Sequence, residues 1–292
     1  MTDQGVTPSQ APIIVIGMHR SGTTAVTRLL EGLGVFMGRY QEGNAEAWMF
    51  FLTNQSLLKK AGGRWDHPDP ALDILESSQR AHYVEGLKRL VRSPLMIGFL
   101  GPVRYLRRHR LARTGAPWGW KDPRNTITLP LWLDVFPHAK VINVTRHGVD
   151  VASSLATRSD SAAEQHDKRA ARRPLLHLLG SLFGPWSRVS PVDDLDGAFE
   201  LWERYMEIGT RWFHEVPPDR RLALAYEDLL ASPRAVAESL AEFCGVSGEE
   251  DLITRAIADL KQSRSLAYRN DDRLAAFAES HADRLARWGY SP

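Results

Sequence analysis

A short apolar run near the N-terminus leads into a loop bounded by glycines, and this junction constrains the fold most strongly. The run IIVIG (13–17) is rich in β-branched residues, which is typical of a strand buried on both faces of a parallel sheet. The segment TTAVTRLLEGLG (23–34) places its apolar residues on one side of a helix and ends in glycine. The loop between them, GMHRSG (17–22), therefore stands at a helix N-terminus, where backbone N–H groups bind phosphate.

The rest of the chain repeats this alternation of apolar runs and helical patterns. Strands are expected at WGWK (118–121), KVINVT (140–145) and RLALAY (221–226). We expect a three-layer α/β fold, a mostly parallel sheet of about four to five strands flanked by helices as in P-loop NTPases. The expected helices are 45–60 (with Asn44 as N-cap), 71–92, 101–112, 127–136, 148–158, 196–216, 227–231, 233–244 and 249–260.

Composition narrows the class of protein. The 292 residues are 43% hydrophobic and 25% charged, as in soluble globular proteins, and the net charge of +2 argues against a nucleic-acid binder. No run approaches the roughly 20 apolar residues of a membrane span. The single cysteine, Cys244, excludes an internal disulfide and is expected to be a buried hydrophobe. Because residues 1–11 lack the features of a signal peptide, we expect a cytoplasmic protein. We also expect residues 1–11 to be a flexible tail and residues 12–292 to form one domain.

The glycines of the loop lie five positions apart, as in the GxxxxGK[ST] loop of NTPases. However, Thr23 stands where an NTPase has the lysine that reaches the β- and γ-phosphates. The strand 140–145 runs into Arg146 and not into an aspartate for magnesium. A nucleotide or small-molecule kinase with a degenerate loop is therefore an alternative, and a loop that holds one terminal phosphate is the leading interpretation.

Two segments carry a resemblance to sulfotransferases that use PAPS (3′-phosphoadenosine 5′-phosphosulfate). HRSGTT (19–24) after a buried strand resembles the 5′-phosphosulfate loop of that family. In RHGVDVASS, Arg146 follows a strand and Ser154 comes eight residues later, which is similar to the family's 3′-phosphate element. An arginine fork and a serine hydroxyl are suitable donors for a phosphate dianion. For the loop, the resemblance implies nucleotide contacts by His19, Arg20, Ser21, Gly22, Thr23 and Thr24.

Further matches extend the resemblance over most of residues 12–245. WKDPR (120–124) is similar to the Lys-Asp-Pro of tyrosylprotein sulfotransferases, whose lysine is catalytic, and this implies a catalytic role for Lys121. LPLWLDVFPHAK (129–140) resembles the helix that precedes the 3′-phosphate strand. AYEDLLASP (225–233) looks like the turn that closes the nucleotide pocket, so Tyr226 is expected beside adenine.

The general base is expected among carboxylates that follow the first helix. NAEAWMFFLTNQSLL (44–58) resembles an Asn-x-Glu segment of bacterial sulfotransferases, which implies Glu46 as the base, in the first turn of a helix whose dipole favours its ionised form. Glu42 and a histidine such as His19 are the rivals. The resemblance implies in-line sulfuryl transfer from PAPS to a hydroxyl or an amine, with 3′,5′-ADP as product, Arg20 and Lys121 stabilising the leaving phosphate, and no metal.

The sequence leaves the acceptor open. A small molecule, a lipid, a glycan and a peptide all remain candidates, and so does any oligomeric state. Trp65, Trp118 and Trp120 are candidates for the wall of the acceptor site, although buried packing explains them as well. The segment 159–195 is expected to be an inserted lid or substrate-binding segment. A non-catalytic module that binds a phosphonucleotide is a further alternative.

Overall fold

The computed structural model describes residues 11–108, 117–157, 192, 194–258, 260 and 266–292. It divides into two compact units. The first unit comprises the chain up to Arg146 and Tyr205–Ser265, and the second comprises His147–Arg204 and Leu266–Pro292. Almost all of the expected tail (1–11) and of the expected insert (159–195) lies outside the described residues. A single domain over 12–292 stays a prediction.

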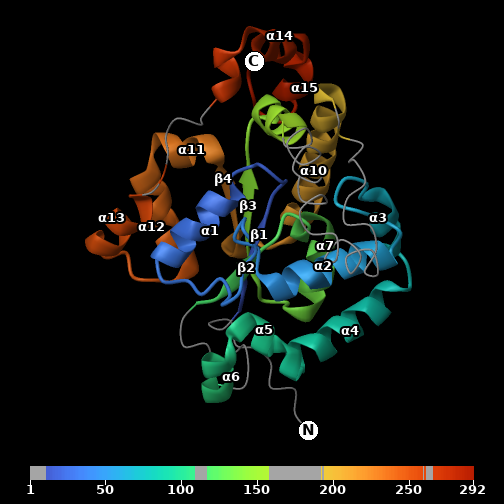
Figure 1. The fold of residues 1–292 in the computed structure, drawn as a ribbon, viewed down its shortest axis with the longest axis vertical. Coiled ribbons are helices and arrows are strands. Elements are labelled where there is room, and N and C mark those ends of the chain that lie inside the picture. Colours follow the sequence, from blue (N-terminus) through green and yellow to red (C-terminus); the bar gives the residue numbers. More distant parts are fainter. Residues whose placement is uncertain (1–10, 109–116, 158–191, 193, 259, 261–265) are drawn as a thin grey trace, which may run out of the picture. The chain divides into compact units, whose positions relative to one another are not determined.

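The first unit is built on a parallel sheet. Among the described residues it has four strands in the order β2-β1-β3-β4, and every neighbouring pair is parallel (Figure 1). The strands are β1 (Ile13–Ile16), β2 (Gly119–Lys121), β3 (Lys140–Thr145) and β4 (Arg221–Ala225). The expected α/β fold with a mostly parallel sheet is confirmed. Because β2 and β3 follow each other in sequence but flank β1 on opposite sides, the topological switch lies between β1 and β3, at the edge where such sheets bind ligands.

Helices cover both faces of this sheet: α1, α12 and α13 lie on one side, and α2 and α7 on the other (Figure 1). The helices of the first unit are α1 (Thr23–Gly32), α2 (Trp48–Lys60), α3 (Asp69–Leu75), α4 (Arg80–Arg92), α5 (Ile97–Leu100), α6 (Pro102–Arg108), α7 (Asn125–Val135), α11 (Tyr226–Ala231), α12 (Pro233–Cys244) and α13 (Glu250–Ile257). The second unit contains helical residues 148–157, α14 (Asp272–Ser280) and α15 (Ala282–Ala286). The long helix α10 (Leu195–Glu215) contributes residues to both units.

The two faces of the sheet have different cores because alternate side chains of a strand point to opposite faces. Ile13 and Val15 of β1 pack with α1, α11 and α12 in an aliphatic core, which also buries Cys244 as predicted. The opposite face carries an aromatic core in which Phe50 of α2 stacks on Trp120 of β2 with ring centroids 4.0 Å apart. Trp118 and Trp120 are both fully buried, so they are core residues and do not line an open acceptor site.

Two helix predictions need correction. The helix expected over 45–60 begins only at Trp48, with Ala47 and not Asn44 as its N-cap, because Ala45 adopts a left-handed φ of 59° and Gln41 forms a bridge with Ala47. The helix expected over 71–92 is two helices, α3 and α4. At the break, the Ser77 hydroxyl donates to the carbonyl of Ile74 and accepts from the N–H of Gln79, which offers the backbone an alternative to helical bonds.

Helix α6 is described only to Arg108, so the expected end at residue 112 is untested. In the part of the chain that the structure describes, no helix has both the length and the apolar character needed to cross a membrane.

Candidate functional site

The loop between β1 and α1 can be formed only with its glycines. Gly17 has a φ of 134°, and a Cβ there would lie 2.3 Å from the carbonyl oxygen of Val144 in β3. Gly22 has a φ of 91°, and its Cβ would lie 2.1 Å from Cδ2 of Tyr226. Both positions therefore combine a backbone conformation that other residues resist with a close approach. The loop is held between β3 and the start of α11.

Further hydrogen bonds fix the loop. The Ser21 hydroxyl donates to the carbonyl of Met18 at 2.7 Å, and the N–H of Gly17 donates to Oγ1 of Thr126 at 2.9 Å. Gly22 is the N-cap of α1 and provides no side chain to its first turn. The first N–H groups of a helix have no acceptor within it, and they carry the positive end of the helix dipole. The loop thus presents the kind of helix N-terminus that binds phosphate.

Two arginines lie at this loop. Arg20 is exposed and has a positive φ of 71°. Arg146, which follows β3, donates from Nη1 to the carbonyl of Arg20 at 3.3 Å. Its guanidinium carbon lies 4.9 Å from the centre of the buried Tyr226 ring. The structure therefore brings the predicted residues Arg20, Gly22, Arg146 and Tyr226 together at the switch between β1 and β3.

Ser154 lies in the helical segment 148–157 of the second unit and is half-buried. Its predicted partnership with Arg146 of the first unit stays a prediction.

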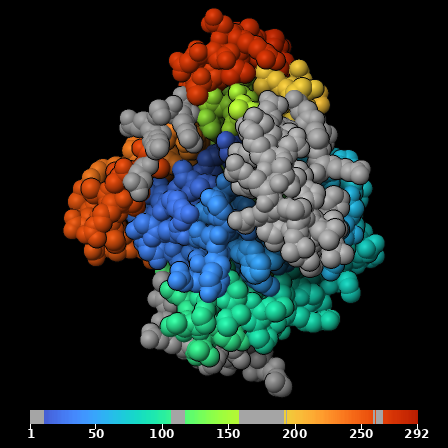
Figure 2. Space-filling view, in the orientation of Figure 1, coloured from blue at the N-terminus to red at the C-terminus, as the bar shows by residue number. Residues whose placement is uncertain are grey.

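Two of the three predicted catalytic residues, Lys121 and Glu46, lie together beside the carbonyl group of Asn44. The carbonyl oxygen of Asn44 accepts from the Lys121 ammonium at 2.6 Å and from the Thr24 hydroxyl at 2.9 Å. The same ammonium lies 3.4 Å from Oε1 of Glu46. Thr24 belongs to the phosphate loop's helix and Lys121 to the end of β2, so the turn 42–46 joins the two. In Figure 2 the blue surface of α1 adjoins the lighter blue surface of residues that follow it in the sequence.

Glu46 does not lie in the first turn of a helix as predicted. It precedes Ala47, the N-cap of α2, because residues 42–46 form a turn that the bridge between Gln41 and Ala47 closes. Its side chain is nevertheless buried, whereas its rival Glu42 is exposed. Burial and Lys121, rather than a helix dipole, therefore control its charge.

Burial moves the titration of both partners in opposite directions. It raises the pKa of the Glu46 carboxyl above the ordinary 4.5, and the Lys121 ammonium only partly opposes this. It also lowers the pKa of the Lys121 ammonium below the ordinary 10.5, against the opposing charge of Glu46. A carboxylate with a raised pKa and an amine with a lowered pKa are typical of groups that exchange protons near neutral pH.

Residues beyond Lys121 form a buried polar network that the sequence motifs do not indicate. Asp122 accepts at Oδ1 from the backbone N–H of Arg124 (3.0 Å) and from its guanidinium (2.9 Å). Asn125 donates to the carbonyl of Val15 in β1 at 3.1 Å. The signal in the sequence is KDPRNTIT (121–128), whose members are all buried although six of them are polar or charged.

His19 is half-buried and contacts the half-buried Trp65 edge to face, with ring centroids 4.7 Å apart. The Trp65 carbonyl accepts from the Tyr205 hydroxyl at 2.7 Å, so α10 anchors this contact. Of the three candidate tryptophans Trp65, Trp118 and Trp120, Trp65 is therefore the one that lies beside the phosphate loop. Thr23 and Ser21 are buried.

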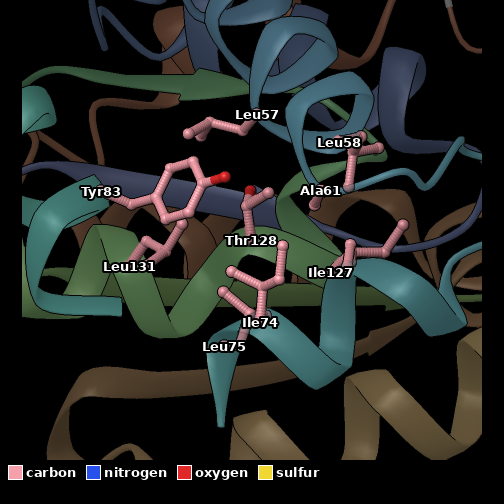
Figure 3. Close-up of a pocket in the computed structure, with 10 residues that line it drawn as sticks. Leu57, Leu58, Ala61, Ile74, Leu75, Tyr83, Ile127, Thr128 and Leu131 are labelled. Atoms are coloured by element: carbon pink, nitrogen blue, oxygen red, sulfur yellow. The ribbon is translucent and has the colours of Figure 1, made fainter. Parts of the chain in front are cut away.

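A hollow between α2, α3, α4 and α7 is apolar and is not the candidate site (Figure 3). It is lined by Leu57, Leu58, Ala61, Ala71, Ile74, Leu75, Tyr83, Ile127, Thr128 and Leu131. The Thr128 hydroxyl is already committed to Asn54 and to the carbonyl of Arg124. The hollow therefore offers little polar chemistry to a reacting group.

Sulfotransferases are among the solved structures that are similar to this chain. The sulfotransferase domain of the Synechococcus PCC 7002 olefin synthase superimposes with a TM-score of 0.53 and 19% identity, over 97% of this chain and 95% of that chain. A sulfotransferase domain from the curacin biosynthetic pathway gives 0.47 and 17% (95% and 96% covered). A sulfotransferase from Alicyclobacillus acidocaldarius gives 0.46 and 15% (95% of both chains). At these identities the first likeness shows the fold alone, and the other two have lower TM-scores.

The family follows from the sequence itself. No curated protein sequence matches the chain. The model of the sulfotransferase family, however, matches residues 12–251, which span the phosphate loop, Lys121, Arg146 and Tyr226. The chain therefore belongs to the sulfotransferase family and is an enzyme of sulfuryl transfer.

Proposed function

We propose that this enzyme transfers a sulfuryl group from PAPS to a hydroxyl group of its acceptor, with Glu46 as general base and Lys121 and Arg20 as the cations that stabilise the leaving phosphate. The observation that carries the proposal is the convergence of Thr24, Lys121 and Glu46 around the Asn44 carbonyl. Burying an ion pair gains little stability, because desolvation offsets most of the attraction. A role in chemistry is the better explanation for a buried Lys121–Glu46 pair.

The residues at the phosphate loop fit a bisphosphorylated nucleotide. The N-terminus of α1, Arg20 and the hydroxyl of Thr23 suit the 5′-phosphosulfate. Thr24, whose hydroxyl donates to the Asn44 carbonyl, would contribute its backbone at the same helix N-terminus. Arg146, with a fixed guanidinium fork next to the loop, suits a second phosphate. The sequence pattern adds Ser154 as a further donor to the 3′-phosphate and Tyr226 as a neighbour of adenine, while His19 and Ser21 support the loop.

The proton balance of the transfer explains the paired charges. The acceptor oxygen forms a bond to sulfur while the bond between sulfur and the 5′-phosphate oxygen breaks, so the acceptor loses a proton and the phosphate gains negative charge. Glu46 takes the proton and becomes neutral. Lys121 then keeps a positive charge that Glu46 no longer neutralises, and this charge stabilises the developing anion. A loose, in-line transition state needs mainly such positioning and charge.

Two alternatives give different results in one experiment. A kinase is disfavoured by the family match and by Thr23 at the position of the NTPase lysine. It would bind ATP and magnesium in preference to 3′,5′-ADP. A non-catalytic module would bind 3′,5′-ADP tightly but would release none from PAPS with any acceptor.

The proposal predicts that 3′,5′-ADP stabilises the protein against heat. At about 100 times its dissociation constant it should add about 2.7 kcal/mol to the free energy of unfolding, and ADP, which lacks the 3′-phosphate, should add less. Arg146→Ala should lose most of this stabilisation. The matched control is Arg255→Ala, which removes an exposed arginine of α13 and should leave the shift unchanged. Equal stabilisation of both variants, or none of the wild type, would contradict the proposal.

A further inference from the structure

Asn54 of α2 has every hydrogen-bonding position of its side-chain amide occupied. It is fully buried, and its Nδ2 donates to Oδ2 of Asp122 at 3.0 Å and to Oδ1 of Asn125 at 2.8 Å. Its Oδ1 accepts from the Thr128 hydroxyl at 3.0 Å and from the Trp132 indole at 2.9 Å. Two donors and two acceptor positions are the full capacity of an amide, so its orientation is fixed.

All four partners belong to one segment of the chain, the turn after β2 and the helix α7. Lys121 is the residue directly before Asp122 in this segment. On the other side, Asn54 stands in the second turn of α2, and the turn 42–46 precedes that helix. Asn54 therefore connects the segment that carries Lys121 with α2, the helix that begins two residues after Glu46.

The partners are themselves held in place. Asp122 accepts from Arg124 at its other oxygen, and Oδ1 of Asn125 also accepts from the Trp120 indole at 3.0 Å. The network thus continues from Asn54 into β2 and, through Asn125 and the Val15 carbonyl, into β1. Partly satisfied polar networks are costly in a buried site, so this one adopts a single arrangement.

We propose that Asn54 is a positioning residue of the transfer reaction: its four hydrogen bonds fix α2 against the segment after β2 and so set where the Lys121 ammonium stands relative to Glu46 and the phosphate loop. This inference rests on the proposed roles of Lys121 and Glu46. It differs from a role in stability alone because Asn54 acts through Lys121.

A double-mutant cycle between Asn54→Ala and Lys121→Ala tests it. The turnover measured is the release of 3′,5′-ADP from PAPS with water as acceptor, corrected for the folded fraction. In the wild-type background Asn54→Ala should lower kcat roughly 100-fold with little change in the KM for PAPS, because a displacement of about 1 Å costs that much. In the Lys121→Ala background it should cost less than about twofold. If the fold-losses in kcat of the two single variants instead multiply in the double variant, the proposal is overturned.

A matched control separates positioning from folding. Leu58 lies one turn further along α2, is buried and lines the apolar hollow together with residues of α7, without a hydrogen bond to the polar network. Leu58→Ala should lower the free energy of unfolding by about 2 to 5 kcal/mol but leave kcat per folded molecule unchanged. If Asn54→Ala does not fold, Thr128→Val removes one of the four bonds and should lower kcat on the order of threefold, with the same dependence on Lys121.

The same double-mutant cycle can be measured through the free energy of unfolding, which needs no substrate. A non-zero coupling between Asn54→Ala and Lys121→Ala is expected there, and an additive result would overturn the inference. If the wild type neither binds 3′,5′-ADP nor consumes PAPS, the proposed function fails, while this coupling still decides whether Asn54 positions Lys121.

Discussion

At the scale of single residues, the glycines of the phosphate loop combine a positive φ with a close approach to neighbouring atoms. Gly22 and Gly34 both have a φ of 91°, but a Cβ at Gly22 would meet the Tyr226 ring, whereas a Cβ at Gly34 would meet nothing within 4 Å. The two positions share the backbone strain and differ only in the close approach.

Gly22→Ala should therefore destabilise the protein by about 1 to 3 kcal/mol more than Gly34→Ala, as overpacking does. It should also weaken 3′,5′-ADP binding, because Tyr226 and the start of α1 must separate. Chemical denaturation and calorimetric titration of the two variants measure both effects. Equal losses in the two variants would show that the Tyr226 contact is unimportant.

At the scale of secondary-structure elements, the charge of the site depends on two segments that bury each other's ionisable groups. Lys121 at the end of β2 and Glu46 before α2 titrate in unusual ranges because the elements exclude water from them. The reaction needs Glu46 ionised and Lys121 protonated. The acid limb of the pH–rate profile should therefore move to higher pH and the alkaline limb to lower pH.

The pH profile of kcat/KM should accordingly rise through an acid limb that lies above 4.5 and fall through an alkaline limb that lies below 10.5. Glu46→Gln should remove the acid limb together with most of the rate, and Lys121→Met should remove the alkaline limb. Steady-state rates from pH 4 to pH 10, with pH stability checked by circular dichroism, measure this. An acid limb that persists in Glu46→Gln would assign the base elsewhere.

The sequence predicted where most helices and strands lie, but not the turns and contacts that connect them. The strands and α1 followed from short apolar runs and glycine positions, because burial on both faces leaves a plain pattern. The start of α2 did not, since the left-handed Ala45 and the bridge from Gln41 to Ala47 depend on contacts across a turn. The network around Asn54 was also missed, because polar residues in a helical pattern are expected on the surface unless their partners are known.

At the scale of the whole molecule, the residues proposed for the transfer chemistry can be considered separately from those proposed for acceptor binding. The first unit holds the phosphate loop, Lys121, Glu46 and Arg146, so the proposed transfer chemistry can be tested in the full chain by substituting these residues, without knowing the acceptor. Ser154 stands in the second unit, and the acceptor-binding role proposed for 159–195 falls almost wholly outside the described residues.

The most direct test of the proposed chemistry compares two carboxylates of one turn, the buried Glu46 and the exposed Glu42. The measurement is the rate at which each glutamine variant releases 3′,5′-ADP from PAPS, at a saturating concentration that a binding titration has established. Glu46→Gln should lose at least about 100-fold, the usual contribution of a general base, with 3′,5′-ADP binding retained. Glu42→Gln should keep the wild-type rate. An active Glu46→Gln beside an inactive Glu42→Gln would contradict the account.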